Sequence, residues 1–147
     1  MTAARRSFAR RIDALAQIVA FTSAFCDRAG ADTAARTRLD LGIEELFTNI
    51  VKYAGGRAPV VIELAREGEC VVATLLDDGG APFDVTRAPA PDLALPLEHR
   101  PVGGLGLHLV RGLVDAIEYR YDAARRQGRV TFRIGLAPAA AATKTGD

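Results

Sequence analysis

Cysteine is scarce in this chain of 147 residues, and Cys26 and Cys70 are the only two. One falls in a helical pattern and the other at the start of a strand, so they have neither the spacing of a metal site nor that of a disulfide framework. We therefore expect two reduced, mostly buried thiols, as in a cytoplasmic protein. Lysine is equally rare, and the many arginines and alanines suggest a GC-rich coding sequence, which is a weak indication of a bacterial source.

Excess charge and long apolar runs are also missing. The formal net charge is +1, so the balance does not favour direct contact with nucleic acid. No run approaches the 18 or so apolar residues that would span a membrane. The basic N-terminus is not followed by the apolar segment of a signal peptide. These absences predict a cytoplasmic protein with one domain and no membrane contact.

Two amphipathic helical patterns open the chain. The first runs from about residue 11 to residue 29 and stops at Gly30. The second begins near Asp32 or Thr33, either of which can cap it, and ends at Gly55. Apolar residues recur in this second pattern at steps of three and four, which predicts a buried stripe. The stripe consists of Leu39, Ile43, Leu46, Phe47, Ile50 and Ala54.

Alternating apolar runs predict two β-hairpins. "APVVIELA" and "CVVATLLD" are separated by "REGE", and "IEYRYDAARRQGRVTFRIGL" turns near residues 125–128. Between the hairpins, five prolines interrupt residues 79–104, and a loop of that length is usually functional or disordered. A third helical pattern follows the loop, with Leu109, Val110, Leu113 and Ile117 on one face.

The order of elements predicts an α+β fold. Because the strands come as hairpins, we expect a two-layer sandwich whose mixed sheet is mainly antiparallel, with three helices on one face. Residues 1–10 form an N-terminal extension with a weak strand pattern near residues 7–10. Residues 11–136 form the domain, and residues 137–147 have no core pattern and are expected to be disordered.

The stretch "LGIEELFTNIVKYA" on the second helix has the first candidate functional residues. Glu45 and Asn49 are four residues apart, so they share a face with Leu41 and Tyr53. The carboxylate could accept a proton, and the amide oxygen could bind a hard cation such as Mg²⁺. Alternatively, this face is simply solvated, with Glu45 paired to Lys52 or to nothing.

The stretch "LLDDGGAPFD" ends an apolar strand with two aspartates and two glycines. An aspartate at a strand end can accept hydrogen bonds from an exocyclic amine such as that of adenine. A glycine there lets a flat ring approach the backbone closely. The alternative interpretation is an ordinary turn, because Asp-Gly is common turn chemistry.

The stretch "GGLGLHLVR" places glycines at the start of a helix, where free N–H groups favour phosphate. It does not fit a dinucleotide fingerprint, because a proline-rich loop precedes it and a hairpin follows. It does not fit a P-loop either, since no Gly-Lys-Ser/Thr follows. Read alone, it is a phosphate cradle of another architecture or only a flexible loop.

Taken together, the three stretches resemble the ATP-binding module of gyrase, mismatch-repair ATPases, heat-shock chaperones and sensor histidine kinases, the Bergerat fold. "EELFTN" resembles its N box, "DDGGAPFD" its first glycine box and "GGLGL" its second, with a lid at about residues 84–103. The closer resemblance, over roughly residues 10–136, is to the anti-sigma-factor serine/threonine protein kinases of bacterial partner-switching systems.

The resemblance implies ATP and Mg²⁺ as cofactors and assigns roles to single residues. Glu45 matches the carboxylate that activates the attacking serine, with Glu44 a less favoured base, and Asn49 matches the Mg²⁺ ligand. Asp78 matches the residue that accepts a hydrogen bond from the adenine amine, with Asp77 as the alternative, and Gly80 matches the glycine beside the ring. Gly104, Gly106 and Leu107 would hold the phosphates through their N–H groups. Thr131 matches a residue that helps to hold adenine.

The resemblance also implies partners. A serine of an anti-sigma-factor antagonist protein would be the substrate, and a sigma factor would be sequestered. Homodimers are usual in the family, although this sequence alone does not show one. Two other functions stay open on the residues: a nucleotide-binding partner-switching module without kinase activity, and a structural domain that binds no nucleotide.

Overall fold

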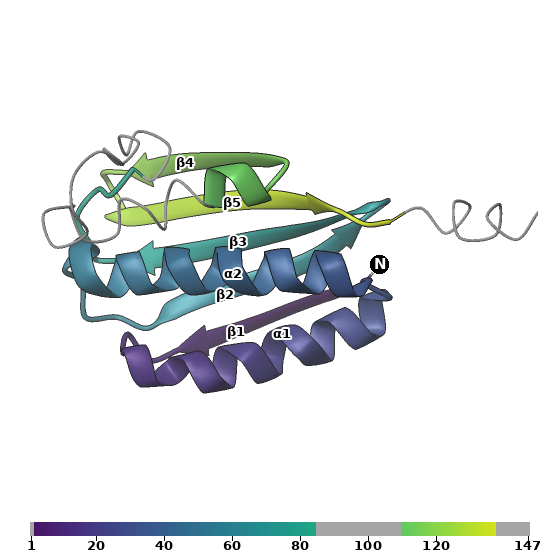
Figure 1. The fold of residues 1–147 in the computed structure, drawn as a ribbon. Coiled ribbons are helices and arrows are strands. Elements are labelled where there is room, and N and C mark those ends of the chain that lie inside the picture. The colour runs from purple at the N-terminus through teal and green to yellow at the C-terminus, as the bar shows by residue number, and fades with distance from the viewer. Residues whose placement is uncertain (1, 85–109, 138–147) are drawn as a thin grey trace, which may run out of the picture.

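The computed structural model describes residues 2–84 and 110–137, which form two layers (Figure 1). One layer is a five-stranded sheet, and α1 and α2 lie side by side on one of its faces. None of the helices in these two ranges is long and apolar enough to cross a membrane. The elements are β1 (Ala3–Phe8), α1 (Leu15–Ala29), α2 (Thr33–Asn49), β2 (Val60–Glu67), β3 (Cys70–Asp78), β4 (Ala116–Asp122) and β5 (Gln127–Gly135).

The sheet has the strand order β1-β2-β3-β5-β4, and every neighbouring pair is antiparallel. Both predicted hairpins are present, as β2–β3 and β4–β5. The α+β two-layer fold is therefore confirmed. The expected mixture of strand directions is not found, because the described strands include no parallel pair.

The helix boundaries follow from local chemistry. A 3₁₀ turn, η1 (Ile12–Ala14), leads into α1, and Gly30 ends α1 in the left-handed conformation at φ 70°. The Asp32 carboxylate accepts a hydrogen bond from the Ala35 N–H at 3.2 Å, so Asp32 is the N-cap of α2. After Asn49 the helix widens into a π-helical segment, η2 (Ile50–Ala54), which Gly55 ends.

The core lies between α2 and the sheet. All six residues of the predicted apolar stripe are buried, and Leu46 and Phe47 are completely so. Gly42 lies on this face, where a Cβ atom would come within 3.0 Å of the Phe132 ring on β5. The missing side chain lets the helix approach the sheet closely, which brings the second half of α2 next to the ends of β3 and β5.

The two ends of the domain differ from the sequence prediction. Residues 3–8 are not an extension outside the fold, because β1 pairs with β2 along its whole length and Phe8 is 1% exposed. The third helix ends at residue 113, and Ile117 lies in β4 instead. The predicted lid beyond residue 84 and the tail from residue 138 lie outside the described residues.

Candidate functional site

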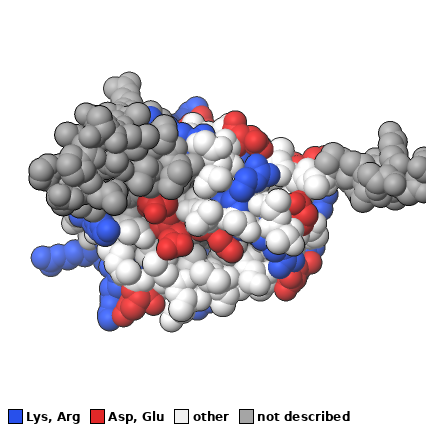
Figure 2. Space-filling view, viewed as in Figure 1, with Lys and Arg blue, Asp and Glu red and all other residues white. Residues whose placement is uncertain are grey.

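The first group of candidate residues lies near the C-terminal end of α2. Glu45 is partly buried, Glu44 is exposed, and Asn49 is 1% exposed. Acidic side chains gather on the surface over α2 (Figure 2), which has Asp40, Glu44 and Glu45 within two turns. The helix therefore offers one half-buried carboxylate and, one turn later, a buried amide.

The amide of Asn49 has an unusual environment. Its Nδ2 atom is buried and has no hydrogen-bond partner among the described residues. Such a group costs on the order of 1–3 kcal/mol, and native proteins contain few of them. It also lies where α2 gives way to the π-helical segment η2, and π-helical turns are frequent at functional sites. A ligand with a hydrogen-bond acceptor would satisfy this Nδ2 atom and offset the cost of burying it.

The environment of Glu45 raises the pKa of its carboxylate above the usual value. Burial raises the pKa of Glu45, the neighbouring Glu44 charge raises it further, and Lys52 opposes the shift. A raised pKa makes the carboxylate a stronger base when it is ionised. The alternative of a simple Glu45–Lys52 surface pair is not seen, since no ion pair between them is formed in the described residues.

The second group lies at the end of β3, where the two aspartates point to opposite faces of the sheet. Asp77 is 5% exposed and lines an apolar crevice on the helix side. Asp78 is half-buried, and it accepts a hydrogen bond from Gln127 Nε2 at 2.8 Å. Because side chains alternate along a strand, only one of the two can reach the crevice. The structure brings Asp77, the fallback, into the site instead of Asp78.

The crevice is a narrow apolar slot between α2 and the sheet. Side chains from the helix end, three strands and the segment after β3 form its walls. Apart from Asp77 they are mostly apolar or aromatic, and an apolar lining with one convergent carboxylate has the polarity that suits a purine base. The lining residues are Leu46, Ile50, Leu75, Asp77, Phe83, Tyr119, Gly128, Arg129 and Val130.

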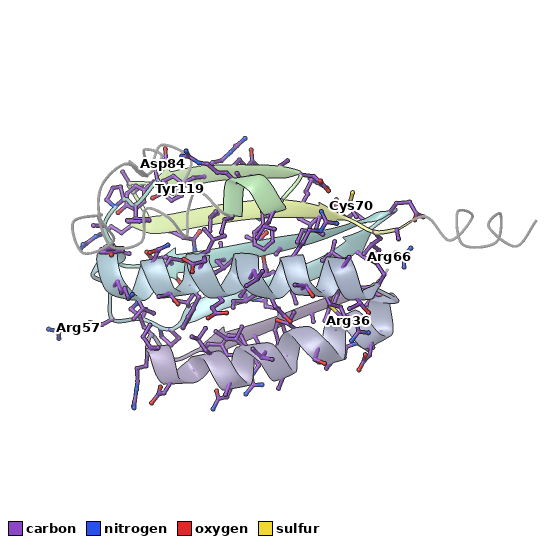
Figure 3. All side chains as sticks on the ribbon, in the orientation of Figure 1. Arg36, Arg57, Arg66, Cys70, Asp84 and Tyr119 are labelled. Carbon is purple, nitrogen blue, oxygen red and sulfur yellow. The ribbon has the colours of Figure 1, made fainter. Side chains whose placement is uncertain are left out.

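The segment after β3 closes one side of this crevice. The Phe83 ring stacks on Tyr53 with centroids 5.5 Å apart, and the Phe83 N–H donates to the Tyr119 hydroxyl at 2.9 Å. The Tyr121 hydroxyl donates to the Gly80 carbonyl at 3.0 Å. Figure 3 shows Tyr119 and Asp84 at this same end of the sheet. The segment is thus fastened to both η2 and β4.

Gly80 lies against the Asp77 carboxylate. A Cβ atom on Gly80 would lie 2.8 Å from the carboxyl carbon of Asp77, closer than real side chains approach. A glycine is therefore required here by the carboxylate, in addition to any ring that approaches it.

The structure does not bring Thr131 into the site. Thr131 projects from the sheet face opposite the helices, where its hydroxyl lies 3.3 Å from that of Thr74. On β5 it alternates with Val130 and Phe132, which face the core. Thr131 therefore cannot contact a base held beside Asp77. Gly104, Gly106 and Leu107 lie outside the described residues, so their predicted roles stay predictions.

Sequence reasoning missed Arg10. Its guanidinium is buried beside Asp77 and forms an ion pair with it. Arg10 follows β1 in a stretch of four closely spaced arginines, and no pattern distinguishes this one from the others. The sequence contains only a weak indication of Tyr119, an aromatic residue that lines the crevice: it alternates with Tyr121 in the strand pattern.

The fold and the site define a class of protein: an α+β domain with a narrow, mostly apolar crevice that contains one carboxylate at the end of its sheet. The chain belongs to the histidine kinase-like ATPase domain family, whose pattern matches residues 8–134.

The relatives agree with this assignment. The chain is 35% identical over 96 residues to the serine/threonine-protein kinase BtrW of Bordetella bronchiseptica, covering 63% of this chain and 64% of that protein. It is 36% identical over 93 residues to the serine-protein kinase RsbW of Bacillus cereus, covering 57% and 56% of the two. The matches thus span about three fifths of the length of these curated relatives.

A solved structure has the same fold. The RsbU and RsbW domains of Rv1364c from Mycobacterium tuberculosis superpose with a TM-score of 0.67 at 18% identity. The match covers 95% of this chain and 34% of that one. At this identity the likeness concerns the fold alone.

Replacing Gly80 with alanine should destabilise the protein by about 1–3 kcal/mol, because the added methyl group has no room beside Asp77. Gly112→Ala is the matched control, since a Cβ atom there meets nothing within 4 Å among the described residues. We expect this control to change the free energy of unfolding by less than about 1 kcal/mol. Urea denaturation measures both variants, and equal stabilities would show that Gly80 is not constrained by the carboxylate.

Proposed function

We propose that this chain binds ATP with Mg²⁺ in the crevice and transfers the γ-phosphoryl group to a serine of an anti-sigma-factor antagonist protein. Its second role is to sequester a sigma factor. The observation that carries the proposal is the buried Nδ2 of Asn49, which has no hydrogen-bond partner among the described residues. Asn49 lies one turn after the half-buried Glu45 and, along the chain, between two residues that line the crevice, Leu46 and Ile50. The names of the relatives BtrW and RsbW support the kinase activity.

The nucleotide base suits the crevice by the polarity of its lining. Apolar side chains from both layers would contact the two faces of adenine, and Asp77 would accept a hydrogen bond from its exocyclic amine. Asp77 thereby takes the role first assigned to Asp78.

The residues of α2 fit a magnesium nucleotide. The amide oxygen of Asn49 is a hard ligand of the kind Mg²⁺ prefers. The buried Nδ2 is a donor without a partner among the described residues, and it would donate to a phosphate oxygen of the same nucleotide. Mg²⁺ bound with the phosphates would neutralise charge that develops on them during phosphoryl transfer. In the glycine-rich stretch, the N–H groups of Gly104, Gly106 and Leu107 are proposed to hold the same phosphates.

Glu45 is the proposed general base. Its carboxylate would take the proton of the substrate serine while the serine oxygen forms a bond to the γ-phosphorus. The bond from that phosphorus to the bridging oxygen breaks, and ADP leaves with the electron pair. Burial and the neighbouring Glu44 charge raise the pKa of Glu45, which makes its ionised carboxylate a stronger base.

The test of this function is phosphate transfer from labelled Mg-ATP to a candidate anti-sigma-factor antagonist protein. Glu45→Gln should lower the transfer rate by about 100-fold or more while changing ATP affinity less than threefold, because it removes the base and keeps the shape. Glu69→Gln, in the exposed β2–β3 turn, is the matched control and should transfer normally.

Two outcomes would contradict the proposal. If Glu45→Gln transfers like the wild type while Glu44→Gln does not, the base is Glu44. If the chain binds Mg-ATP but labels no antagonist, it is a partner-switching module without kinase activity.

The pH dependence of transfer should report the environment of Glu45. The base works only when ionised, so the rate should fall as the pH drops through its raised pKa. Glu44→Gln removes a charge that raises this pKa and should move the acidic limb to lower pH. Lys52→Met removes the opposing charge and should move it to higher pH. Shifts in the same direction, or none, would show that another group controls the limb.

A further inference from the structure

Arg10 is a buried cation that the proposed function has not yet used. It lies two residues after β1, and its side chain is only 5% exposed, while that of its partner Asp77 is 8% exposed. The next residue, Arg11, is 71% exposed and pairs with Asp13 at the surface. Two adjacent arginines therefore have opposite environments, and only the buried one reaches the site.

The guanidinium of Arg10 is fixed at several points. Nη2 donates to Asp77 Oδ1 and, at 3.2 Å, to the Asp78 carbonyl, while Nε donates to the Ala58 carbonyl at 2.9 Å. These bonds tie the loop before β2 to the end of β3 through one planar group. A planar guanidinium held in this way fixes the position of the carboxylate oxygen that it contacts, in addition to pairing with its charge.

Two glycines make room for the ion pair. A Cβ atom on Gly56 would lie 2.8 Å from Arg10 Nη2 and 3.0 Å from the Gly80 nitrogen, and one on Gly80 would collide with Asp77. The backbone therefore approaches both members of the pair more closely than other residues would permit.

The arrangement is more costly than a structural link requires. Arg10 Nη1 is buried without a hydrogen-bond partner among the described residues, so the cation is not fully satisfied. Burying an ion pair seldom adds stability over apolar side chains of the same size. What the pair does provide is a charged carboxylate of defined orientation at the wall of an apolar crevice.

We propose that Arg10 is a positioning residue for base selection: it holds one oxygen of Asp77 and leaves the other to accept the exocyclic amine of adenine. The hydrogen bond from Arg10 goes to Asp77 Oδ1, and Oδ2 lies beside Gly80, in the segment that closes the crevice. The inference rests on the proposed function, because it requires a purine nucleotide in the crevice. The chemical class selected is a purine with an amino group at position 6.

The test compares two nucleotides that differ only in that amine: ATP and purine riboside 5′-triphosphate. Calorimetry in Mg²⁺ buffer should show that the wild type prefers ATP by roughly 10–100-fold, the range of one hydrogen bond to a charged group. In Arg10→Met the preference should fall below about threefold, through weaker ATP binding. Arg11→Met, which removes the exposed neighbour, should keep the wild-type preference.

The other possible binding results distinguish between the inference and the proposed function. If Arg10→Met weakens both nucleotides by the same factor, Arg10 only supports the structure and the inference is overturned. If the wild type binds both nucleotides equally, Asp77 does not read the amine, which also overturns it. If the wild type binds neither nucleotide, the proposed function itself fails. Should Arg10→Met not fold, Arg10→Gln decides: its shorter, uncharged side chain removes the ion pair with Asp77, and an unreduced preference would refute the inference.

Discussion

The close approach of α2 to the sheet is the constraint on which the rest of the structure depends. Gly42 leaves space that the Phe132 ring fills, so the helix axis can lie near β3 and β5. One turn later the same helix presents Glu45, and two turns later Asn49. The end of β3 places Asp77 at the wall of the same crevice. A bulkier residue at position 42 would separate these groups without touching any of them.

Around this crevice, buried polar groups are retained among apolar side chains at a cost to stability. The Asn49 amide and the Arg10 guanidinium each have a buried nitrogen without a partner in the described part of the chain. Burial also raises the pKa of Glu45. A sequence selected only for stability would replace such groups with apolar ones. Their concentration around a single crevice indicates that the crevice, and not the fold, requires them.

Periodicity predicted the fold well, because the apolar patterns of α2 and of the two hairpins are long and regular. It could not choose between Asp77 and Asp78, since the face of a strand residue depends on how the strand packs against the helices. The face of Thr131 could not be predicted for the same reason, and the structure places it on the sheet face opposite the helices. Ile117 fits both a helical and a strand period. Arg10 gave no signal, because only folding brings residues 67 positions apart together.

The central claim is that Asp77 and Asn49 together bind one magnesium nucleotide from the two layers of the fold. A crystal structure with Mg²⁺ and a non-hydrolysable ATP analogue tests it most directly. The account predicts the exocyclic amine of adenine at about 2.7–3.2 Å from the Asp77 carboxylate, and the Asn49 side-chain oxygen at about 2.0–2.1 Å from the metal. Adenine bound on the sheet face of Asp78 and Thr131, or a metal without Asn49, would contradict it.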